Sequence, residues 1–287
     1  MPITVNTNIP SLTAQKSLNK STSAMNTAME RMSTGYKINS SKDDAAGMAV
    51  ATNLEYKASS YKIAQDNAQM GQSMLDTTEG VLDVIKANLT RVRDLTEQAA
   101  NGTYGSDALT AINSEISARL DEIDRVVKSA DFNGKILLIG EDVTGGIKSD
   151  IELQVGIGKA GSDSTIKVSK ELFSNAESKK LLGNTDFVDF TSDEDARAFL
   201  EKVDGAIKEI TSRKTTIGGL QARITSAMDT ANVMQTNLTS AASLIQDADV
   251  AVESSNYIKQ QILQQTSASL LATANQSSSI ALNLIGG

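Results

Sequence analysis

Acidic side chains stand close together at two places in the chain, where they could in principle hold a cation or transfer protons. Asp43 and Asp44 are adjacent in SSKDDAAG (residues 40–47), and Asp247 and Asp249 lie in QDAD (residues 246–249). The first stretch lacks the spacing of oxygen ligands that an EF-hand loop requires. The second lacks any sign of the pocket and perturbed partner that acid–base catalysis needs. We interpret the first stretch as a turn or helix start, and the second as structural.

Other reactive side chains are missing from the sequence. It contains no cysteine and no histidine, which excludes thiolate nucleophiles, disulfides, zinc–thiolate sites and the commonest general base. The glycine-rich stretch GIGKAGSDST (residues 156–165) is not closed by the Lys-Ser or Lys-Thr of a phosphate-binding loop. We therefore expect no catalytic residues, no cofactor and no metal site.

The charge and hydropathy of the chain argue against two kinds of partner. The net charge is −8 and the pI is near 4.8, and no basic stripe with interleaved aromatic residues is present to neutralise phosphates. No run of 18 apolar residues occurs, and the start MPITVNTNIPSL does not resemble a secretory signal. We expect neither nucleic-acid binding nor membrane spanning, and these observations do not argue against export.

Helical periodicity dominates the sequence before residue 134. Apolar or small residues recur at spacings of three and four from Leu75 to Ala99, and Asn101-Gly102 is a natural stop. A second helix is expected to begin near Ser106 and to end before Asn133-Gly134, packing antiparallel to the first because the loop is short. The period then changes to two, which predicts a β-hairpin. The alternating residues of this hairpin are Ile151, Leu153, Val155, Ile166 and Val168.

A long helix is expected after Ser192, which forms a capping-box pattern with Asp195. Three-four spacing then persists to Ala248, as in a coiled coil, with Gly218-Gly219 as the weakest point. Such a helix would be ~84 Å long at ~1.5 Å per residue. A compact globule of this size would measure only ~50 Å across, so an elongated molecule is expected.

Leu95 does not fit the apolar stripe of its helix. At 100° per residue Leu89, Val92, Thr96 and Ala99 share one face, whereas Leu95 falls at the margin beside Arg91 and Gln98. Such a leucine either widens the core contact or stays accessible to a partner.

The two ends of the chain differ from the middle. Residues 1–42 and 257–287 are rich in Ser, Thr, Asn and Gln, and their apolar residues are too thinly spread to support lone helices in water. We expect these segments to become ordered only against partners.

Long motifs at both ends of the sequence are typical of one family. RMSTGYKINSSKDDAAGMAV (residues 31–50), TTEGVL, NLTRVRDLTEQAANGT and FNGKILL occur in the first half, and SLIQDADVAVE and QQILQQTSASLLATANQ near the end. On these motifs the sequence resembles bacterial flagellin over about two thirds of its length. It departs from the usual pattern at Gln69-Met70-Gly71, where the family commonly has Asn-Asp-Gly, and at Ser277-Ser278-Ser279, where a proline is common.

The resemblance implies a mainly α fold: an elongated antiparallel helical rod, similar to a coiled coil, with a small β-hairpin and paired N- and C-terminal helices. It also implies a division of the chain into five segments. These are an N-terminal assembly segment (1–42), the first rod helices (43–134), the hairpin region (135–191), the long rod helix (192–248) and a C-terminal assembly segment (249–287).

The resemblance further implies that the protein is a structural subunit, not an enzyme, that polymerises with itself into the flagellar filament for swimming. The contacts between subunits would be heterologous and would not close into a ring. Export through the flagellar secretion apparatus with a chaperone, an extracellular location, and contacts with the filament cap and hook-junction proteins are also implied. The residues expected to serve assembly are Arg31, Lys42, Asp43, Asp44, Asp247, Asp249, Ile262, Leu263, Leu270 and Leu271.

The same resemblance assigns a second role to the margin of the first rod helix. Arg91, Leu95 and Glu115 match the residues through which the host Toll-like receptor for flagellin contacts the monomer. An exposed leucine beside a long cation is chemically suited to such a contact. The main alternative to a filament subunit is the hook-filament junction protein, which has similar ends. A secreted translocator that inserts helices into membranes is a more remote one.

Overall fold

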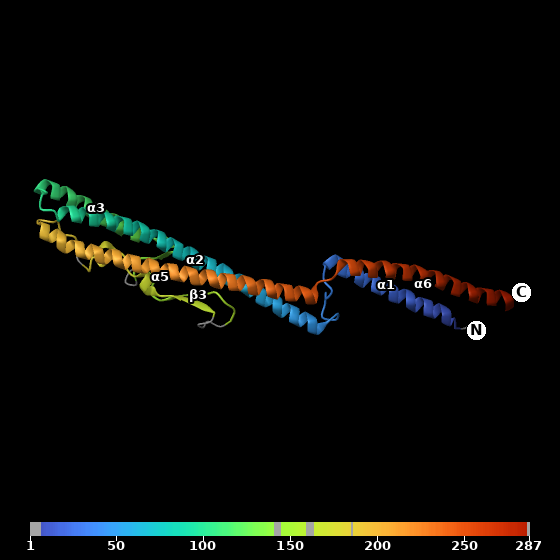
Figure 1. Ribbon diagram of the computed structural model, residues 1–287. Coiled ribbons are helices and arrows are strands. Elements are labelled where there is room, and N and C mark those ends of the chain that lie inside the picture. Colours follow the sequence, from blue (N-terminus) through green and yellow to red (C-terminus); the bar gives the residue numbers. More distant parts are fainter. Residues whose placement is uncertain (1–6, 141–144, 159–163, 185, 286–287) are drawn as a thin grey trace. The chain divides into compact units, whose positions relative to one another are not determined.

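The computed structural model describes residues 7–140, 145–158, 164–184 and 186–285 (Figure 1). Within these ranges the chain is mainly helical, with two short antiparallel strand pairs, which confirms the predicted fold class. The elements are α1 (Ile9–Thr34), α2 (Ala45–Ala99), α3 (Ser106–Ser129), β1 (Asp131–Phe132), β2 (Lys135–Ile136), β3 (Ile151–Gln154), β4 (Thr165–Val168), the 3-10 helix η1 (Lys170–Phe173), α4 (Ser178–Leu181), α5 (Asp193–Gln246) and α6 (Val250–Ile285).

The chain divides into two compact units. Unit 1 combines Met1–Ala58 with Thr236–Gly287, and unit 2 consists of Ser59–Gln235. Unit 1 therefore joins the two ends of the sequence, while α2 and α5 each supply residues to both units. Division into two units does not test the five segments expected from the sequence, which remain a prediction.

The core of unit 2 is built from buried residues that repeat every seven positions. Leu75, Leu82 and Leu89 of α2 are fully buried, and α3 and α5 carry equivalent rows. The row on α3 contains Ile116 and Ile123, and the row on α5 contains Val203, Ile210, Ile217 and Ile224. A seven-residue repeat keeps one seam facing its neighbour over many turns, so the coiled-coil prediction holds in this unit. Helix α5 also runs unbroken through Gly218-Gly219.

The periodic run on α5 is less uniformly buried than the spacing predicts. Met234 is 44% exposed, although the three-four pattern placed it in the seam. Leu238 and Ile245 are half-buried, and the helix ends at Gln246, before Ala248. The pattern is correct for the helix, but a helix can continue beyond the part that has neighbours on its apolar face.

The expectation that Leu95 lies at an exposed margin is wrong, because its side chain is only 2% exposed. Its neighbour Arg91 bonds to Glu115 of α3, while Arg93 bonds to Asp204 of α5. Helix α2 therefore has neighbours on two flanks, and Leu95 belongs to the core that α2 shares with α3 and α5. A helical wheel that assumes one packing partner predicts too narrow a buried face when two neighbouring helices pack against the same helix.

Unit 2 contains two short antiparallel strand pairs. Strand β3 pairs with β4 antiparallel in the register Ile151↔Val168 and Leu153↔Ile166, which confirms the predicted hairpin. Residues 159–163 of its connection lie outside the described residues. The shorter pair β1–β2 was not anticipated. Its turn places Asn133 and Gly134 at φ 52° and 79°, the left-handed region that these residue types tolerate best.

The start of α5 confirms the predicted capping box. The Ser192 hydroxyl accepts from the Asp195 N–H at 3.2 Å, and the Asp195 carboxylate accepts from the Ser192 N–H at 3.1 Å. Two backbone donors at the helix start are thus satisfied reciprocally.

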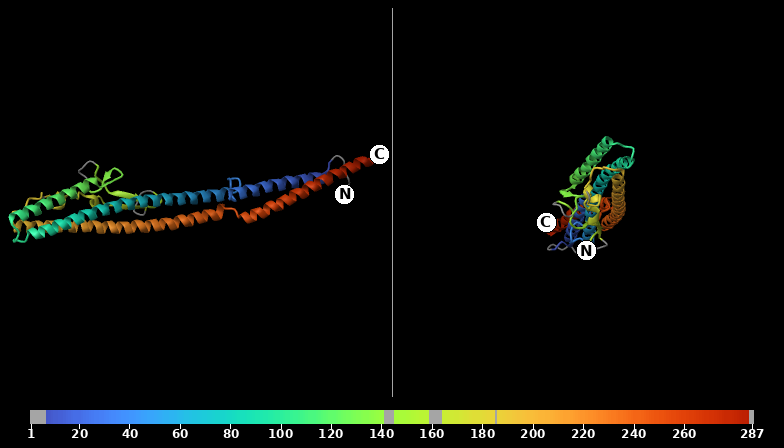
Figure 2. Two further views of the ribbon diagram at one scale, coloured as in Figure 1. Left: turned by 90° about the horizontal axis from the view of Figure 1, so that it is seen from above. Right: turned by 90° about the vertical axis from the view of Figure 1, so that its left-hand side faces the viewer.

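The two long helices α1 and α6 make up most of unit 1, and they lie side by side in Figure 1 and in the left-hand view of Figure 2. The residues of α1 that are buried in this pair are small: Ala14, Ser21 and Ala28, again seven apart. Ser267 is buried on α6. Small residues let the helices approach closely, but they remove little apolar area from water.

Candidate assembly surface

The turn before α2 is organised by two adjacent carboxylates. Asp43 accepts hydrogen bonds from the hydroxyl and the N–H of Ser40, both at 3.0 Å, and from the N–H of Asn39 at 3.3 Å. The hydroxyl of Ser40 contributes most to holding the pKa of Asp43 below its usual value of 3.8. Asp44 caps α2 by accepting from the N–H of Gly47 at 2.9 Å. The interpretation of SSKDDAAG as a turn and helix start is therefore confirmed.

The acids of QDAD have comparable local roles between α5 and α6. Asp249 caps α6, because its carboxylate accepts from the N–H groups of Ala251 and Val252 at 2.8 and 3.2 Å. The carboxylate of Asp247 accepts from the Ser243 hydroxyl at 2.5 Å. Its backbone forms an antiparallel bridge with Tyr36. All four predicted assembly acids thus have intrachain partners, and the segment after α1 is tied to the segment before α6.

The ion pair between Arg31 and Glu253 joins α1 to α6. The Nη1 atom of Arg31 lies 3.2 Å from Oε1 of Glu253, and their side chains are 29% and 11% exposed. The resemblance to the family implied that Arg31 serves assembly but gave no indication of its partner. Glu253 itself was the feature of the sequence that could have indicated this partner. It is an acid in a helix of mostly uncharged residues, and a nearly buried carboxylate needs a cation beside it.

Large apolar side chains of α6 remain at the surface of unit 1. Ile258, Ile262, Leu263 and Leu270 are between 42% and 57% exposed, and Leu271 is half-buried. At 100° per residue the first four lie within an arc of about 140° on the helix. We call these four residues the α6 stripe. Ile9 and Leu12 of α1 are also more than half exposed.

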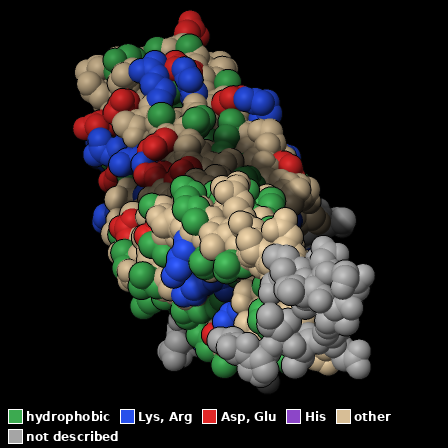
Figure 3. Space-filling model, turned by 90° about the vertical axis from the view of Figure 1, so that its right-hand side faces the viewer, with side chains coloured by type: hydrophobic (Ala, Val, Ile, Leu, Met, Phe, Trp, Pro, Cys, Tyr) green, Lys and Arg blue, Asp and Glu red, His purple; other side chains and the backbone are tan. Residues whose placement is uncertain are grey.

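The α6 stripe depends on which residues of α6 are apolar and on which of them α1 leaves exposed. Apart from Glu253, the buried residues of the α1–α6 seam are small, whereas the four large apolar residues of the stripe stay 42–57% exposed. Figure 3 shows hydrophobic side chains on the surface, interspersed with polar ones. Four large apolar residues on one arc of a helix indicate a surface that another protein covers.

Arg91 and Glu115 form a second, charged feature in unit 2. The Nε atom of Arg91 lies 2.9 Å from Oε1 of Glu115, and Arg119 lies 3.8 Å from the same oxygen. The hydrogen bond from Arg91 lowers the pKa of Glu115 and outweighs the opposing effect of desolvation. Arg91 and Glu115 are 45% and 37% exposed, so this pair is accessible. Leu95, the third residue predicted for this site, lies in the core beneath it.

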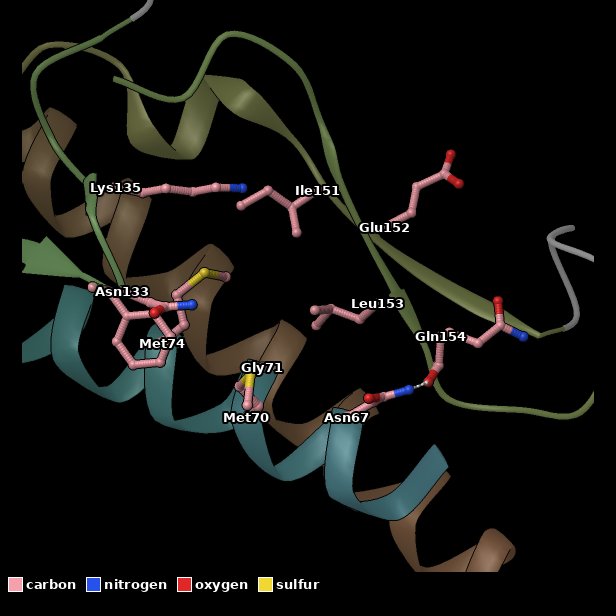
Figure 4. A pocket seen from close by; sticks show the side chains of 11 residues that line it. Asn67, Met70, Gly71, Met74, Asn133, Lys135, Ile151, Glu152, Leu153 and Gln154 are labelled. Carbon is pink, nitrogen blue, oxygen red and sulfur yellow. Dashed lines mark hydrogen bonds between the residues drawn. The ribbon is translucent and has the colours of Figure 1, made fainter. Parts of the chain in front are cut away.

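A groove of about 350 Å³ lies between α2 and the hairpin of unit 2 (Figure 4). Met70, Met74 and Leu153 line it, with Lys135 and Glu152 as its charged residues. A side chain at Gly71 would bring a Cβ atom to 2.5 Å from Leu153, so the glycine permits this close approach of the hairpin. The lining is suited to apolar contact and contains no nucleophile–base pair.

The described residues contain no group of three or more acids that could hold a metal ion. None of the described helices combines the length and the hydropathy that crossing a bilayer requires.

The comparisons with known proteins agree with this geometry. The family models for the bacterial flagellin N-terminal and C-terminal helical regions match residues 5–142 and 200–285. Flagellin of Bacillus subtilis (strain 168) is 34% identical over 301 residues, which cover 98% of this chain and 99% of the relative. Polar flagellin F of Vibrio parahaemolyticus is 29% identical over 377 residues and the full length of both chains.

Solved structures give the same result. The crystal structure of Bacillus cereus flagellin aligns with a TM-score of 0.50 and 28% identity, covering 62% of this chain and 94% of that one. A flagellar hook-associated protein from Vibrio parahaemolyticus aligns with a TM-score of 0.58 over 71% of this chain and 99% of that one. At 16% identity, this second likeness shows a shared fold alone.

Paired long helices with a heptad core and an exposed apolar stripe define a structural helical subunit. The chain belongs to the flagellin family, as the family models and the relatives of equal length show. It is therefore a structural subunit of the bacterial flagellar filament, and it polymerises with copies of itself.

Proposed function

We propose that the filament built from this chain serves swimming and that the α6 stripe is the surface by which subunits associate. The observation that supports this proposal is the division of α6 into two faces. Its seam with α1 buries small residues, while Ile262 and Leu270 are each 57% exposed. Burying a large aliphatic side chain contributes about 1.5–3 kcal/mol, so covering the stripe would favour association strongly.

The other residues predicted for assembly fit the same proposal in different ways. Lys42 is exposed, so its ammonium group would be accessible to a neighbouring subunit. Together with the hydroxyl of Ser40, its charge also helps to lower the pKa of the adjacent Asp43. Arg31 would hold α6 in place through Glu253. The acids Asp43, Asp44, Asp247 and Asp249 would shape the turns and contact neighbours only through their remaining lone pairs.

Polymerisation from short filament seeds tests this proposal. The double variant Ile262→Asp with Leu270→Asp places two charges in the stripe and should not elongate seeds. The matched control is Gln261→Asp, because Gln261 is exposed on α6 but lies outside the arc of the stripe. It should polymerise like wild type. Electron microscopy gives filament length, and circular dichroism shows whether the helices persist. Normal filaments from the double variant would show that the stripe does not mediate assembly.

The same assay separates a filament subunit from a hook-filament junction protein. A filament subunit should add repeatedly to seeds, whereas a junction protein should bind at the end of a hook without repeating. We further propose that the chain reaches the cell exterior through the flagellar export apparatus with a chaperone. The filament cap and the hook-junction proteins are its other proposed partners.

A second proposal is that the host Toll-like receptor for flagellin contacts the monomer through Arg91 and Glu115, with Leu95 supporting them from below. The accessible ion pair supports it, since a guanidinium can bind a carboxylate of a partner through two parallel hydrogen bonds. Arg91→Ala should lower receptor signalling. Arg93→Ala is a matched control, because Arg93 is also exposed on α2 and paired with an acid of another helix. Equal loss of signalling in both variants would refute a specific role for Arg91.

A further inference from the structure

The chain contains two Asn-Gly steps, Asn101-Gly102 and Asn133-Gly134, which the structure holds in different ways. Asn-Gly is the sequence in which a side-chain amide is most open to attack by the following backbone nitrogen, because glycine has no side chain to hinder it. We propose that Asn101 is a site of spontaneous conversion to aspartate and isoaspartate, and that the fold protects Asn133 from the same reaction.

The loop between α2 and α3 prepares Asn101 for this reaction. The Oδ1 atom of Asn101 accepts from the hydroxyl of Thr103 at 3.2 Å and from its N–H at 3.4 Å. Both donors draw electron density from the amide carbonyl, and they would stabilise the negative oxygen of a tetrahedral intermediate. Thr103 therefore acts as a positioning residue for the amide that is attacked.

The attacking group is also available in this loop. Asn101, Gly102 and Thr103 are exposed to water, and the N–H of Gly102 donates no hydrogen bond within the described residues. The turn is closed by one backbone bond, from the N–H of Tyr104 to the carbonyl of Asn101 at 3.3 Å. A loop closed by so few bonds can rearrange to bring the nitrogen of Gly102 to the side chain of Asn101.

Asn133 lies in a contrasting environment. It occupies the turn between β1 and β2 with Gly134, and both residues have left-handed φ angles that the paired strands impose. The N–H of Gly134 donates to the carboxylate of Asp131 at 3.2 Å. The nitrogen that would attack is therefore engaged by an acceptor, and removing its proton beside a carboxylate is unfavourable.

The reaction balances with water as the only co-reactant. Hydroxide removes the proton from the Gly102 nitrogen, which forms a bond to Cγ of Asn101. The bond from Cγ to the side-chain nitrogen breaks, and ammonia leaves after protonation. Water then opens the five-membered imide at either carbonyl. Opening at one carbonyl gives aspartate, and opening at the other gives isoaspartate, in which the backbone runs through the side chain.

The product changes the charge and the backbone of the loop. Either product adds one negative charge beside Arg197, whose guanidinium donates to the carbonyl of Ala100 at 3.4 Å. Isoaspartate also inserts one methylene into the chain immediately after α2. The fraction of subunits with aspartate or isoaspartate at position 101 would therefore rise with the age of the protein.

Incubation of the full-length folded protein in ¹⁸O-labelled water at mildly alkaline pH, followed by peptide mass spectrometry, tests the proposal. Labelled product should appear at Asn101 roughly tenfold faster than at Asn133, the ratio that a barrier difference of about 1.4 kcal/mol gives. In guanidinium chloride, where the fold is lost, the two sites should react at similar rates. Similar rates in the folded protein, or the same preference in the unfolded chain, would overturn the proposal.

Two variants separate the chemistry from stability. Gly102→Ala should slow the reaction at Asn101, and the structure has room for the added methyl group, with no atom within 4 Å. Thr103→Val removes only the hydroxyl donor and should slow it severalfold. Thr110→Val is the matched control, because the hydroxyl of Thr110 bonds to its own helix at Ser106. An unchanged rate in both Gly102→Ala and Thr103→Val would refute the assigned roles.

Discussion

The carboxylate of Glu253 on α6 lies 3.2 Å from the guanidinium of Arg31 on α1, and the acid is almost buried, with 11% of its side chain exposed. The carboxylate also lies 3.4 Å from the side-chain amide of Asn256. In a seam whose other buried residues are mostly small, this ion pair is a charged contact that helps to align the two helices, together with hydrogen bonds such as that from Gln264 to Thr22.

Removal of the cation should therefore weaken the terminal helix pair. Arg31→Met keeps much of the side-chain length but leaves Glu253 without its charge partner, which we expect to cost about 1–3 kcal/mol. Hydrogen exchange should show faster opening of α1 and α6, with unit 2 unchanged. Glu30→Gln, an exposed change on the neighbouring residue, is the control. Adding Glu253→Gln to Arg31→Met should restore part of the protection, because it removes the unpaired charge. If Arg31→Met alone is as stable as wild type, the ion pair has no structural role.

Leu95 should behave as a core residue. Leu95→Ala removes a side chain that is 2% exposed, and the expected cost is about 2–5 kcal/mol in the free energy of unfolding. Val84→Ala, on the same helix but 44% exposed, should cost much less. Denaturant titration of both variants gives the comparison. Receptor signalling per folded molecule should fall little in Leu95→Ala, and a strong loss without destabilisation would mean that Leu95 is accessible after all.

The start of α5 should respond to acid. Hydrogen bonds from the hydroxyl of Ser192, and next from that of Thr191, lower the pKa of Asp195 from its usual 3.8. A folded-state pKa below the unfolded one means that the charge stabilises the fold above pH 3.8 and that this contribution is lost as pH falls through the folded value. Asp195→Asn should therefore lower the melting temperature near neutral pH, and the difference should shrink in acid. A difference that is constant with pH would exclude the charge as its cause.

Deletion of residues 257–287 should destabilise unit 1 and leave unit 2 folded. The shortened chain loses all four residues of the α6 stripe and should fail to elongate filament seeds. Helix α1 loses the partner that covers Ala14 and Ser21, so its amides should exchange rapidly. The amides of Leu82 to Val92 in unit 2 should stay protected, because that core contains no residue of the deleted segment. Filament growth from this deletion would refute the assembly proposal, and loss of protection throughout would refute the independence of unit 2.

Local rules within the sequence predicted several features correctly. The hairpin register follows from alternation of Ile151 and Leu153 with polar residues, and the start of α5 follows from Ser192 and Asp195. These features depend on side chains only a few positions apart, or on the period with which a segment must present one face. The heptad rows of α2, α3 and α5 belong to the same class, since their spacing is written directly in the chain.

The sequence by itself thus determined that the segments of α2, α3 and α5 are helices, which face of each carries the apolar rows, and the capping box at the start of α5. Only the tertiary structure decided how many neighbours each face meets. Leu95 is buried because it belongs to a core that α2 shares with both α3 and α5. Ile262 stays exposed because α1 packs on the opposite, small-residue face of α6. Burial of a side chain depends on the helices around it, whereas periodicity reports only the helix that carries it.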